Sequence, residues 1–223
     1  MSRVAVHTAG SPLDAFWKRA FDIVISLIAL VFSLPITLAV ALAVVCETGR
    51  PVLYRGWRVG RDGRIFRIVK FRTMHVGSDG RGGTLTVAND PRITRVGRFL
   101  RRTKLDEFPQ LLNVLYGDMS LVGPRPEHPN YVRTYTEEQR RVLSVRPGIT
   151  GIASVRYRNE SDLLCGEDAE AIYRSVIMPD KLRLELEYLE HRDFWSDASL
   201  ILTTLAVLPG SASLVQPTSG SSQ

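Results

Sequence analysis

The sequence predicts an α+β protein that associates with a membrane. It would have an N-terminal re-entrant helix kinked at a proline, then a small cytoplasmic domain of short helices around a small antiparallel β-sheet, with amphipathic helices at the membrane surface. Three observations carry this prediction. Residues 23–46 contain no charged side chain. Two strand-like segments flank a turn at residues 60–63. Short segments later in the chain have apolar residues at helical spacing.

Composition limits the class of partner. The chain has 223 residues and a formal net charge of +6, and 25 of its 29 basic residues are Arg. Such a chain attracts phosphate groups, although an arginine-rich genome would give the same composition. The basic residues lack interleaved aromatic residues and a known nucleic-acid motif, so we expect no nucleic-acid partner. Cys46 and Cys165 form no metal-ligand pattern, and we expect no disulfide between them.

The uncharged segment from Ile23 to Cys46 is long enough to cross a bilayer, which needs about 20 apolar residues. A secretory signal is the alternative, but the apolar core of such a signal has only about 7–15 residues. Pro35 bends a helix here, and Ser33 can satisfy a freed carbonyl. Basic residues flank the segment on both sides, and positive charge marks the cytoplasmic side. We therefore expect residues 16–48 to enter the membrane and return, with a straight span as the alternative.

Residues 52–74 predict two strands around the turn Gly60-Arg61-Asp62-Gly63. Lys70 and Arg72 lie on one face of the second strand, because side chains alternate along a strand. A solvent-exposed sheet face is the alternative to a binding role for this pair. The polar, glycine-rich residues 76–90 predict a loop that covers a site. A helix is predicted next, at residues 92–102, with an inward face formed by Val96, Phe99 and Leu100.

Two adjacent carboxylates, Asp106 and Glu107, open a predicted short helix that ends at the C-cap Gly117. Its apolar face consists of Phe108, Leu111, Leu112 and Leu115. Thr103 and Asp106 have the spacing of a capping box, which would place Pro109 awkwardly deep in the helix. If Asp106 is itself the N-cap, Pro109 falls in the first turn and is tolerated. Both registers place two carboxylates at the positive end of a helix dipole.

Arg125 lies between two prolines in the segment Gly123-Pro124-Arg125-Pro126-Glu127. Prolines restrict the backbone on both sides, so the guanidinium, which suits phosphate oxygens, loses little entropy on binding. Six basic residues precede this segment: Arg92, Arg95, Arg98, Arg101, Arg102 and Lys104. An acid pair beside so much positive charge suggests phosphoryl chemistry with a divalent metal. The alternative is a helix cap, a solvated basic face and a proline-rich turn.

The C-terminal half predicts mainly helices. A capping box at residues 136–139 starts one helix, residues 148–151 form a turn, and a polar loop continues to about residue 168. Helices follow near residues 169–177 and 181–191. An apolar helix at residues 198–208, opened by Phe194-Trp195, lies either in the membrane interface or in the core. Residues 210–223 are rich in Ser and Gly and predict disorder.

Many ordered motifs in residues 16–208 resemble the bacterial sugar transferases, the monotopic phosphoglycosyl transferases that start glycan assembly on polyprenyl phosphate. The motifs are Lys18-Arg19-x-x-Asp22, Ser33-x-Pro35, Pro51-Val52, Arg58-Val59-Gly60, Lys70-Phe71-Arg72-Thr73-Met74, Asp90-Pro91-Arg92-Ile93-Thr94-Arg95-x-Gly97-x-Phe99-Leu100-Arg101, Leu105-Asp106-Glu107-x-Pro109-Gln110-Leu111-x-Asn113-Val114-Leu115, residues 117–127, and Pro147-Gly148-Ile149-Thr150-Gly151.

The resemblance implies transfer of a sugar-1-phosphate from a UDP-sugar to polyprenyl (undecaprenyl) phosphate, with release of UMP, as the first membrane step of glycan or polysaccharide assembly. It implies that Asp106 is the nucleophile, which forms a covalent phosphosugar intermediate, and that Glu107 holds Mg²⁺. The phosphate- and substrate-binding residues would be Lys70, Arg72, Arg102, Arg125 and Asp197. Ser33 and Pro35 would form the membrane kink.

The expected organisation is a flexible N-terminus at residues 1–15, the membrane helix at 16–48, a catalytic domain on the cytoplasmic face of the inner membrane at 49–209, and a disordered tail at 210–223. Membrane lipid is an expected partner, and a homodimer is compatible with the resemblance. Residues 152–168 differ from the pattern of many members, so the sugar stays open. The alternative hypothesis is a catalytically inactive, membrane-anchored scaffold of a glycan assembly complex.

Overall fold

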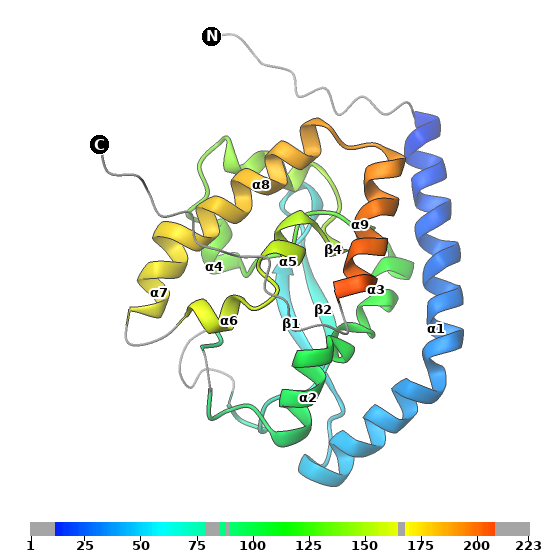
Figure 1. The fold of residues 1–223 in the computed structure, drawn as a ribbon, viewed down its shortest axis with the longest axis vertical. Helices are drawn as coiled ribbons and strands as arrows, with labels where there is room; N and C mark the ends of the chain where they lie inside the picture. The colour runs from blue at the N-terminus through cyan, green and yellow to red at the C-terminus, as the bar shows by residue number, and fades with distance from the viewer. Residues whose placement is uncertain (1–11, 79–84, 88–89, 165–167, 208–223) are drawn as a thin grey trace.

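The structure is a computed structural model that describes residues 12–78, 85–87, 90–164 and 168–207. Helix α1 (Pro12–Thr48) runs along one side of a body built from short helices and two small sheets (Figure 1). The helix begins earlier than the predicted start at residue 16. The predicted disordered tail, from residue 210 onwards, lies outside the described residues.

Helix α1 confirms the long apolar N-terminal segment. It is the one helix in the described ranges that is long and apolar enough to cross a membrane, over Leu13–Thr48. Pro35 lies inside it, and the ribbon changes direction before its C-terminal end (Figure 1). Near the proline, side-chain hydroxyls bind helix carbonyls: Ser33 Oγ donates to Leu30 O at 3.3 Å, and Thr37 Oγ1 donates to Ser33 O at 2.8 Å. Thr37 was not among the residues predicted to stabilise the kink.

The predicted hairpin is confirmed. Strands β1 (Leu53–Val59) and β2 (Ile65–Phe71) pair antiparallel, with Leu53 opposite Phe71 and Val59 opposite Ile65. A 3₁₀ turn at Arg61–Gly63 joins the strands. Alternation along β2 buries Phe66 and Ile68 against Val114 and Met119, so the hairpin packs on the segment that follows the acid pair.

A second sheet corrects the prediction of a single antiparallel sheet. Strands β3 (Ser120–Val122) and β4 (Gly148–Thr150) pair parallel, so the residues predicted as a turn at 148–151 are largely strand. A three-residue strand is too short to show alternation in the sequence. Gly148 is needed here because a Cβ at this position would collide with the backbone of Gly123.

The remaining helices are short. They are α2 (Arg95–Thr103), α3 (Gln110–Tyr116), α4 (Pro129–Val132), α5 (Ile152–Arg156), α6 (Glu160–Leu163), α7 (Ala169–Ile172), α8 (Met178–Glu190) and α9 (Phe194–Val207). Two 3₁₀ turns lie at Leu105–Glu107 and Gln139–Ser144. The predicted capping box is confirmed at the latter, where Thr136 N donates to Gln139 Oε1 and Gln139 N donates to Thr136 Oγ1.

Several predicted helix boundaries and faces are wrong. The predicted polar loop at residues 152–168 contains α5 and α6, which have five and four residues and are too short for a periodic signal. A π-helical turn at Tyr173–Ile177 joins α7 directly to α8, so the two predicted helices follow each other without a loop. Phe99 was expected to face inward but is 59% exposed, whereas Leu100 is buried.

The largest cluster of buried residues lies under α8 and includes Tyr131, Tyr173, Ile177 and Leu182. A second cluster joins the C-terminal part of α1 to β2 and α2 through Val40, Val44, Phe71 and Leu100. The apolar residues of α9 contribute Leu200 to a third cluster, against which residues of α1 pack. The stretch predicted to carry the chemistry contacts α1 by way of α3 and contacts α8 by way of Glu127.

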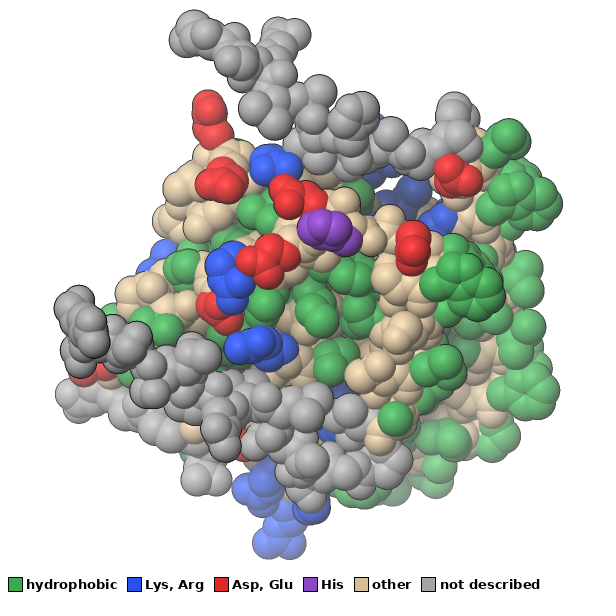
Figure 2. Space-filling model, turned by 45° about the horizontal axis from the view of Figure 1, so that its top comes forward, with side chains coloured by type: hydrophobic (Ala, Val, Ile, Leu, Met, Phe, Trp, Pro, Cys, Tyr) green, Lys and Arg blue, Asp and Glu red, His purple; other side chains and the backbone are tan. Residues whose placement is uncertain are grey.

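Helices α1 and α9 also leave large apolar side chains exposed. Helix α1 exposes Val24, Leu27, Ile28, Val31, Phe32, Leu34, Ile36, Leu38, Leu42 and Val45, and α9 exposes Phe194, Trp195, Leu202 and Leu205. In Figure 2, hydrophobic side chains gather along the right-hand side, where α1 lies. So large an apolar surface is unusual for a protein surrounded by water and marks a membrane or protein contact. Helix α9 thus has one face in the core and another that is exposed.

Candidate active site

Asp106 and Glu107 lie in the 3₁₀ turn between α2 and α3. Lys104 enters this turn with a φ of 59°, in the left-handed region, which ends α2 and redirects the chain. Neither predicted capping register is right. Thr103 Oγ1 donates back to Phe99 O within α2 at 2.9 Å, and Pro109 occupies the N-cap position of α3. Both carboxylates still lie just before the N-terminus of α3, and Gly117 ends that helix with a φ of 91°, as predicted.

Asn113 fixes α3 against the strand that carries Lys70. Its Oδ1 accepts from Val69 N at 2.9 Å, and its Nδ2 donates to Arg67 O at 2.9 Å. The side chain thus replaces a neighbouring strand along the edge of β2. Glu107 lies in the 3₁₀ turn directly before α3, and Asn113 lies in α3. The bonds of Asn113 therefore fix the position of β2, and with it Lys70, relative to the acid pair.

Glu107 joins two basic residues from distant parts of the sequence. Its Oε1 accepts from Lys70 Nζ at 2.8 Å and from Arg125 Nη2 at 2.8 Å. The side chains of Lys70, Glu107 and Arg125 are 18%, 11% and 31% exposed, so the cluster is shielded but reachable. Three of the residues predicted for the site therefore meet at one carboxylate oxygen, with Asp106 beside them in sequence.

The segment that carries Arg125 is held at both ends by backbone hydrogen bonds. Gly123 N donates to Thr150 O at 3.0 Å, and Gly148 N donates to Pro124 O at 2.9 Å. At the other end, Val59 N donates to Glu127 O at 3.0 Å. The prolines on either side of Arg125 are buried. The restricted backbone predicted from the sequence is thus tied to β4 on one side and to β1 on the other.

The two carboxylates have different electrostatic surroundings. Burial raises the pKa of Asp106, and the nearby charge of Lys70 only partly opposes this. Burial also acts to raise the pKa of Glu107, but the positive charges of Arg125 and Lys70 outweigh it and hold that pKa well below its usual value. Glu107 is therefore the more readily ionised member of the pair, and the charge of Asp106 depends more on its surroundings.

Two further cations surround the acid pair. Burial lowers the pKa of Lys104, against the opposing charge of Glu107, and burial lowers the pKa of Arg101, against the opposing charge of Asp106. An anion that bound beside them would offset this cost of burial. Positive groups from β2, α2 and the Arg125 segment thus converge on two adjacent carboxylates, which suits a phosphorylated ligand.

A divalent metal fits the donor set. Asp106 Oδ1 is buried and has no hydrogen-bond partner among the described residues. The described part of the chain has no cluster of three or more His, Cys, Asp or Glu residues that could hold a metal alone. Magnesium is commonly bound by one or two carboxylates together with substrate phosphates and water, so a pair of adjacent carboxylates is sufficient protein ligation.

Three of the predicted substrate-binding residues lie elsewhere. Arg72 Nη2 donates to Thr48 O and Gly49 O, at 3.1 and 2.7 Å, at the C-terminal end of α1. Arg102 is exposed on α2. Asp197 is buried on α9, where it pairs with Arg192 Nη2 at 2.8 Å. The structure does not bring these three side chains to Glu107.

Asp197 instead belongs to a polar cluster that fastens α1 to the body. Lys18 Nζ lies 2.6 Å from Asp22 Oδ1 and 3.4 Å from Asp197 Oδ2. Ser120 Oγ on β3 donates to Asp22 Oδ2 at 2.8 Å. The cluster joins α1, β3 and α9, and Asp197 holds α9 to α1 within it.

Sequence reasoning did not select Arg101 and Lys104 for the site, although it noted both among the basic residues before the acid pair. The helical register of α2 decides this, because it leaves Arg101 half-buried and its neighbour Arg102 exposed. The amphipathic pattern of residues 95–103 contains that information, since Leu100 marks the inward face.

Comparison with known proteins identifies relatives over most of the chain. The family model described as bacterial sugar transferase matches residues 13–210. A UDP-glucose:undecaprenyl-phosphate glucose-1-phosphate transferase of Escherichia coli is 38% identical over 199 residues, which are 87% of this chain and 40% of that protein. A protein of the same name from Caulobacter vibrioides is 39% identical over 194 residues, 86% of this chain and 69% of that protein.

A third relative, a UDP-N-acetylgalactosamine-undecaprenyl-phosphate N-acetylgalactosaminephosphotransferase of Aeromonas hydrophila, is 36% identical over 203 residues, 89% of this chain and 45% of that protein. The chain thus spans less than half the length of two of these three relatives. The family match covers α1, the acid pair and the Arg125 segment together. The chain therefore belongs to the bacterial sugar transferase family.

Proposed function

We propose that the protein transfers a sugar-1-phosphate from a UDP-sugar to polyprenyl phosphate, such as undecaprenyl phosphate, and releases UMP. The observation that carries this proposal is the acid pair itself: a buried Asp106 oxygen without a partner lies next to Glu107, which is held by Lys70 and Arg125. The named activities of the relatives agree with this reaction class.

In the first step, a carboxylate oxygen of Asp106 attacks the sugar-proximal phosphorus of the UDP-sugar. A bond forms between this oxygen and phosphorus, the bond from phosphorus to the bridging oxygen breaks, and UMP leaves with that oxygen. Asp106 then carries the phosphosugar as an acyl phosphate. The nearby cations Lys70, Lys104 and Arg101 favour the ionised form of Asp106 and reduce the repulsion between it and the anionic donor.

In the second step, a phosphate oxygen of the polyprenyl phosphate attacks the same phosphorus. The bond to Asp106 breaks, the carboxylate is regenerated, and the sugar is left on a polyprenyl diphosphate. Glu107, together with Asp106, would hold Mg²⁺, which when bound neutralises diphosphate charge. Arg125 contributes a planar guanidinium that suits phosphate oxygens.

We also propose that α1 enters the cytoplasmic leaflet of the bacterial inner membrane and returns, with the catalytic domain on the cytoplasmic face. Pro35 inside an apolar helix, basic residues at both of its ends, and exposed apolar side chains on α1 and α9 support this arrangement. The acid pair would then lie near the head groups, where a polyprenyl phosphate presents its charge. A homodimer is compatible with this placement.

The reaction is tested by UMP release from a panel of UDP-sugars, with purified membranes, Mg²⁺ and undecaprenyl phosphate. We expect repeated turnover, with UMP in excess over protein, from at least one sugar only when the lipid is present, and no UMP from Asp106→Asn. Membrane association should be equal in both proteins. A donor labelled in the sugar should leave label on the wild-type protein when the lipid is omitted, and none on the variant.

The scaffold alternative makes the opposite forecast. It predicts that Asp106→Asn and Glu107→Gln retain function in a cell that depends on this protein for glycan assembly. Turnover by Asp106→Asn at the wild-type rate would overturn the nucleophile assignment.

A further inference from the structure

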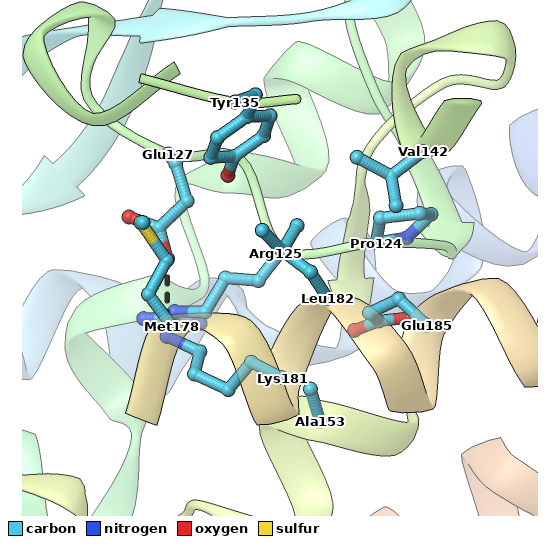
Figure 3. A pocket seen from close by; sticks show the side chains of 10 residues that line it. All are labelled: Pro124, Arg125, Glu127, Tyr135, Val142, Ala153, Met178, Lys181, Leu182 and Glu185. Carbon is cyan, nitrogen blue, oxygen red and sulfur yellow. Dashed lines mark hydrogen bonds and ion pairs between the residues drawn. The ribbon is translucent and has the colours of Figure 1, made fainter. Parts of the chain in front are cut away.

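Lys181 lies beneath the Arg125 segment, within α8, and is only 5% exposed. Its Nζ donates to Glu127 Oε1 and to Glu160 Oε2, both at 3.0 Å. Tyr173 OH donates to the same Glu127 oxygen at 2.7 Å. Figure 3 shows α8 presenting Lys181 and neighbouring side chains towards the segment that carries Arg125 and Glu127. The lysine therefore joins three separate parts of the chain.

Glu127 and Lys181 are charged at neutral pH. Burial would raise the pKa of Glu127, but the charge of Lys181 and the hydrogen bonds from Tyr173 and Lys181 outweigh it and bring that pKa to about 2. Burial would lower the pKa of Lys181, but the charges of Glu127 and Glu160 outweigh it and raise that pKa. The single ammonium group of Lys181 thus partly neutralises two carboxylates, those of Glu127 and Glu160. Buried ion pairs of this kind are weak contributors to stability, so their presence calls for another explanation.

That explanation lies in the position of Arg125. Its pKa is raised by Glu107 first, against burial, and further by Glu160 and Glu127. The guanidinium therefore lies within the fields of three carboxylates but makes its ion pair with Glu107. Lys181 occupies the other two. If its charge were absent, Glu127 and Glu160 would be left partly unpaired and would compete with Glu107 for the guanidinium.

We propose that Lys181 is a positioning residue that keeps Arg125 directed at Glu107 by neutralising Glu127 and Glu160, and that holds α6 beside the site. This inference rests on the proposed function for its kinetic consequences. It makes α6, which carries Glu160, part of the wall next to Arg125. Lys181 itself does not contact Glu107 and is not a catalytic residue.

The kinetic test uses UMP release per folded protein. Lys181→Met should lower kcat/KM by about 100-fold, the size of effect expected for a misplaced binding group. Removing a competing acid as well, in Lys181→Met/Glu160→Gln, should recover about tenfold of this loss. In an Arg125→Ala background, Lys181→Met should change kcat/KM by less than about threefold. Arg183→Met is the matched control, because Arg183 lies on the same helix but its side chain is 53% exposed.

A purely structural role would give a different pattern. It would lower the amount of folded protein, leave kcat/KM of the folded fraction unchanged, and show no recovery with Glu160→Gln. Equal losses from Lys181→Met in the wild-type and Arg125→Ala backgrounds would also overturn the inference, because Lys181 would then act independently of Arg125.

A second measurement does not depend on turnover. Amide hydrogen exchange should accelerate in peptides that cover residues 123–133 and 157–164 of Lys181→Met, and not in those of Arg183→Met. If no UDP-sugar gave UMP with the wild-type protein, the proposed function would fail while this measurement still decided whether Lys181 holds the two segments. Unchanged exchange in both segments would overturn the positioning role.

Discussion

The guanidinium of Arg125 donates to Glu107 Oε1 over 2.8 Å, although the two residues are 18 positions apart in the sequence. This contact joins the turn after α2 to the proline-flanked segment after β3. A carboxylate fixed in this way is kept ionised, and the hydrogen bonds from Lys70 and Arg125 both go to Oε1. The pair thus combines charge neutralisation with a hard oxygen donor set, as phosphate–metal chemistry requires.

Arg125→Gln should reduce kcat/KM for UMP release by about 100-fold, since under the proposed function the variant lacks a positive charge that would face the transferred phosphoryl group. Arg125→Lys should recover part of this, because an ammonium supplies the charge but not the planar fork. The measurement is steady-state UMP release at several donor concentrations. An exposed arginine, Arg183, provides the control through Arg183→Gln, which should retain the wild-type rate; equal activity of Arg125→Gln and wild type would contradict the proposed role.

Asn113→Ala should destabilise the protein by about 2–4 kcal/mol, because it removes both side-chain bonds to β2 and leaves Val69 N and Arg67 O without these partners. The free energy of unfolding in detergent, from urea titration, is the quantity to measure. Asn130→Ala is the matched control, since Asn130 is exposed, and it should change stability by less than about 0.5 kcal/mol. Similar values for both variants would show that the bonds of Asn113 contribute nothing.

Sequence reasoning predicted those parts of the fold that have long or chemically specific signals. The apolar helix, the hairpin around Gly60–Gly63, the C-cap at Gly117 and the capping box at residues 136–139 are confirmed. Each depends on local physics: hydrophobicity, strand propensity, a positive φ or a reciprocal side-chain bond. The meeting of Lys70, Glu107 and Arg125 was expected from the family resemblance rather than from spacing alone.

The errors have a common physical cause. Strand β4, α5 and α6 have five residues or fewer, and tertiary contacts rather than local pattern determine them. Arg72 and Lys70 share a strand face in the alternating pattern, but the end of α1 lies next to Arg72 and takes up its hydrogen bonds. Whether Arg72 binds an anion or the carbonyls at the end of α1 depends on the three-dimensional packing, which is not evident from a single sequence.

Glu185→Gln should remove a pH dependence of stability. Burial raises the pKa of Glu185 from 4.5 to about 7, although the backbone amides of Ala153 and Arg125 and the charge of Lys181 oppose it. The carboxyl lines a cavity of about 20 Å³, room for one water, with Tyr135 also in its lining. Because the folded-state pKa is raised, the neutral acid is favoured in the fold. The contribution of Glu185 to the stability of the protein is fully present below about pH 4.5 and is lost as the pH rises through about 7.

Above pH 7 this loss amounts to about 3 kcal/mol. Thermal unfolding in detergent between pH 5 and 8 should therefore show the Glu185→Gln variant gaining stability relative to wild type as the pH rises. The exposed Glu187 offers a control, and Glu187→Gln should follow the wild-type curve. A constant difference between Glu185→Gln and wild type across this range would mean that Glu185 is ionised throughout.

The proposed path of α1, into the membrane and back, predicts the side from which its two ends can be labelled. Cys46 is free and exposed near the C-terminal end, and Trp17 is 66% exposed near the other end. In a Cys165→Ser background, a membrane-impermeant maleimide should label Cys46, and separately Trp17→Cys with Cys46→Ser, in inside-out vesicles but not in intact spheroplasts. A straight span would place one of these cysteines on each side. Pro35→Leu should shift the pattern towards that of a straight span, because the substitution restores the helix hydrogen bond that a proline lacks.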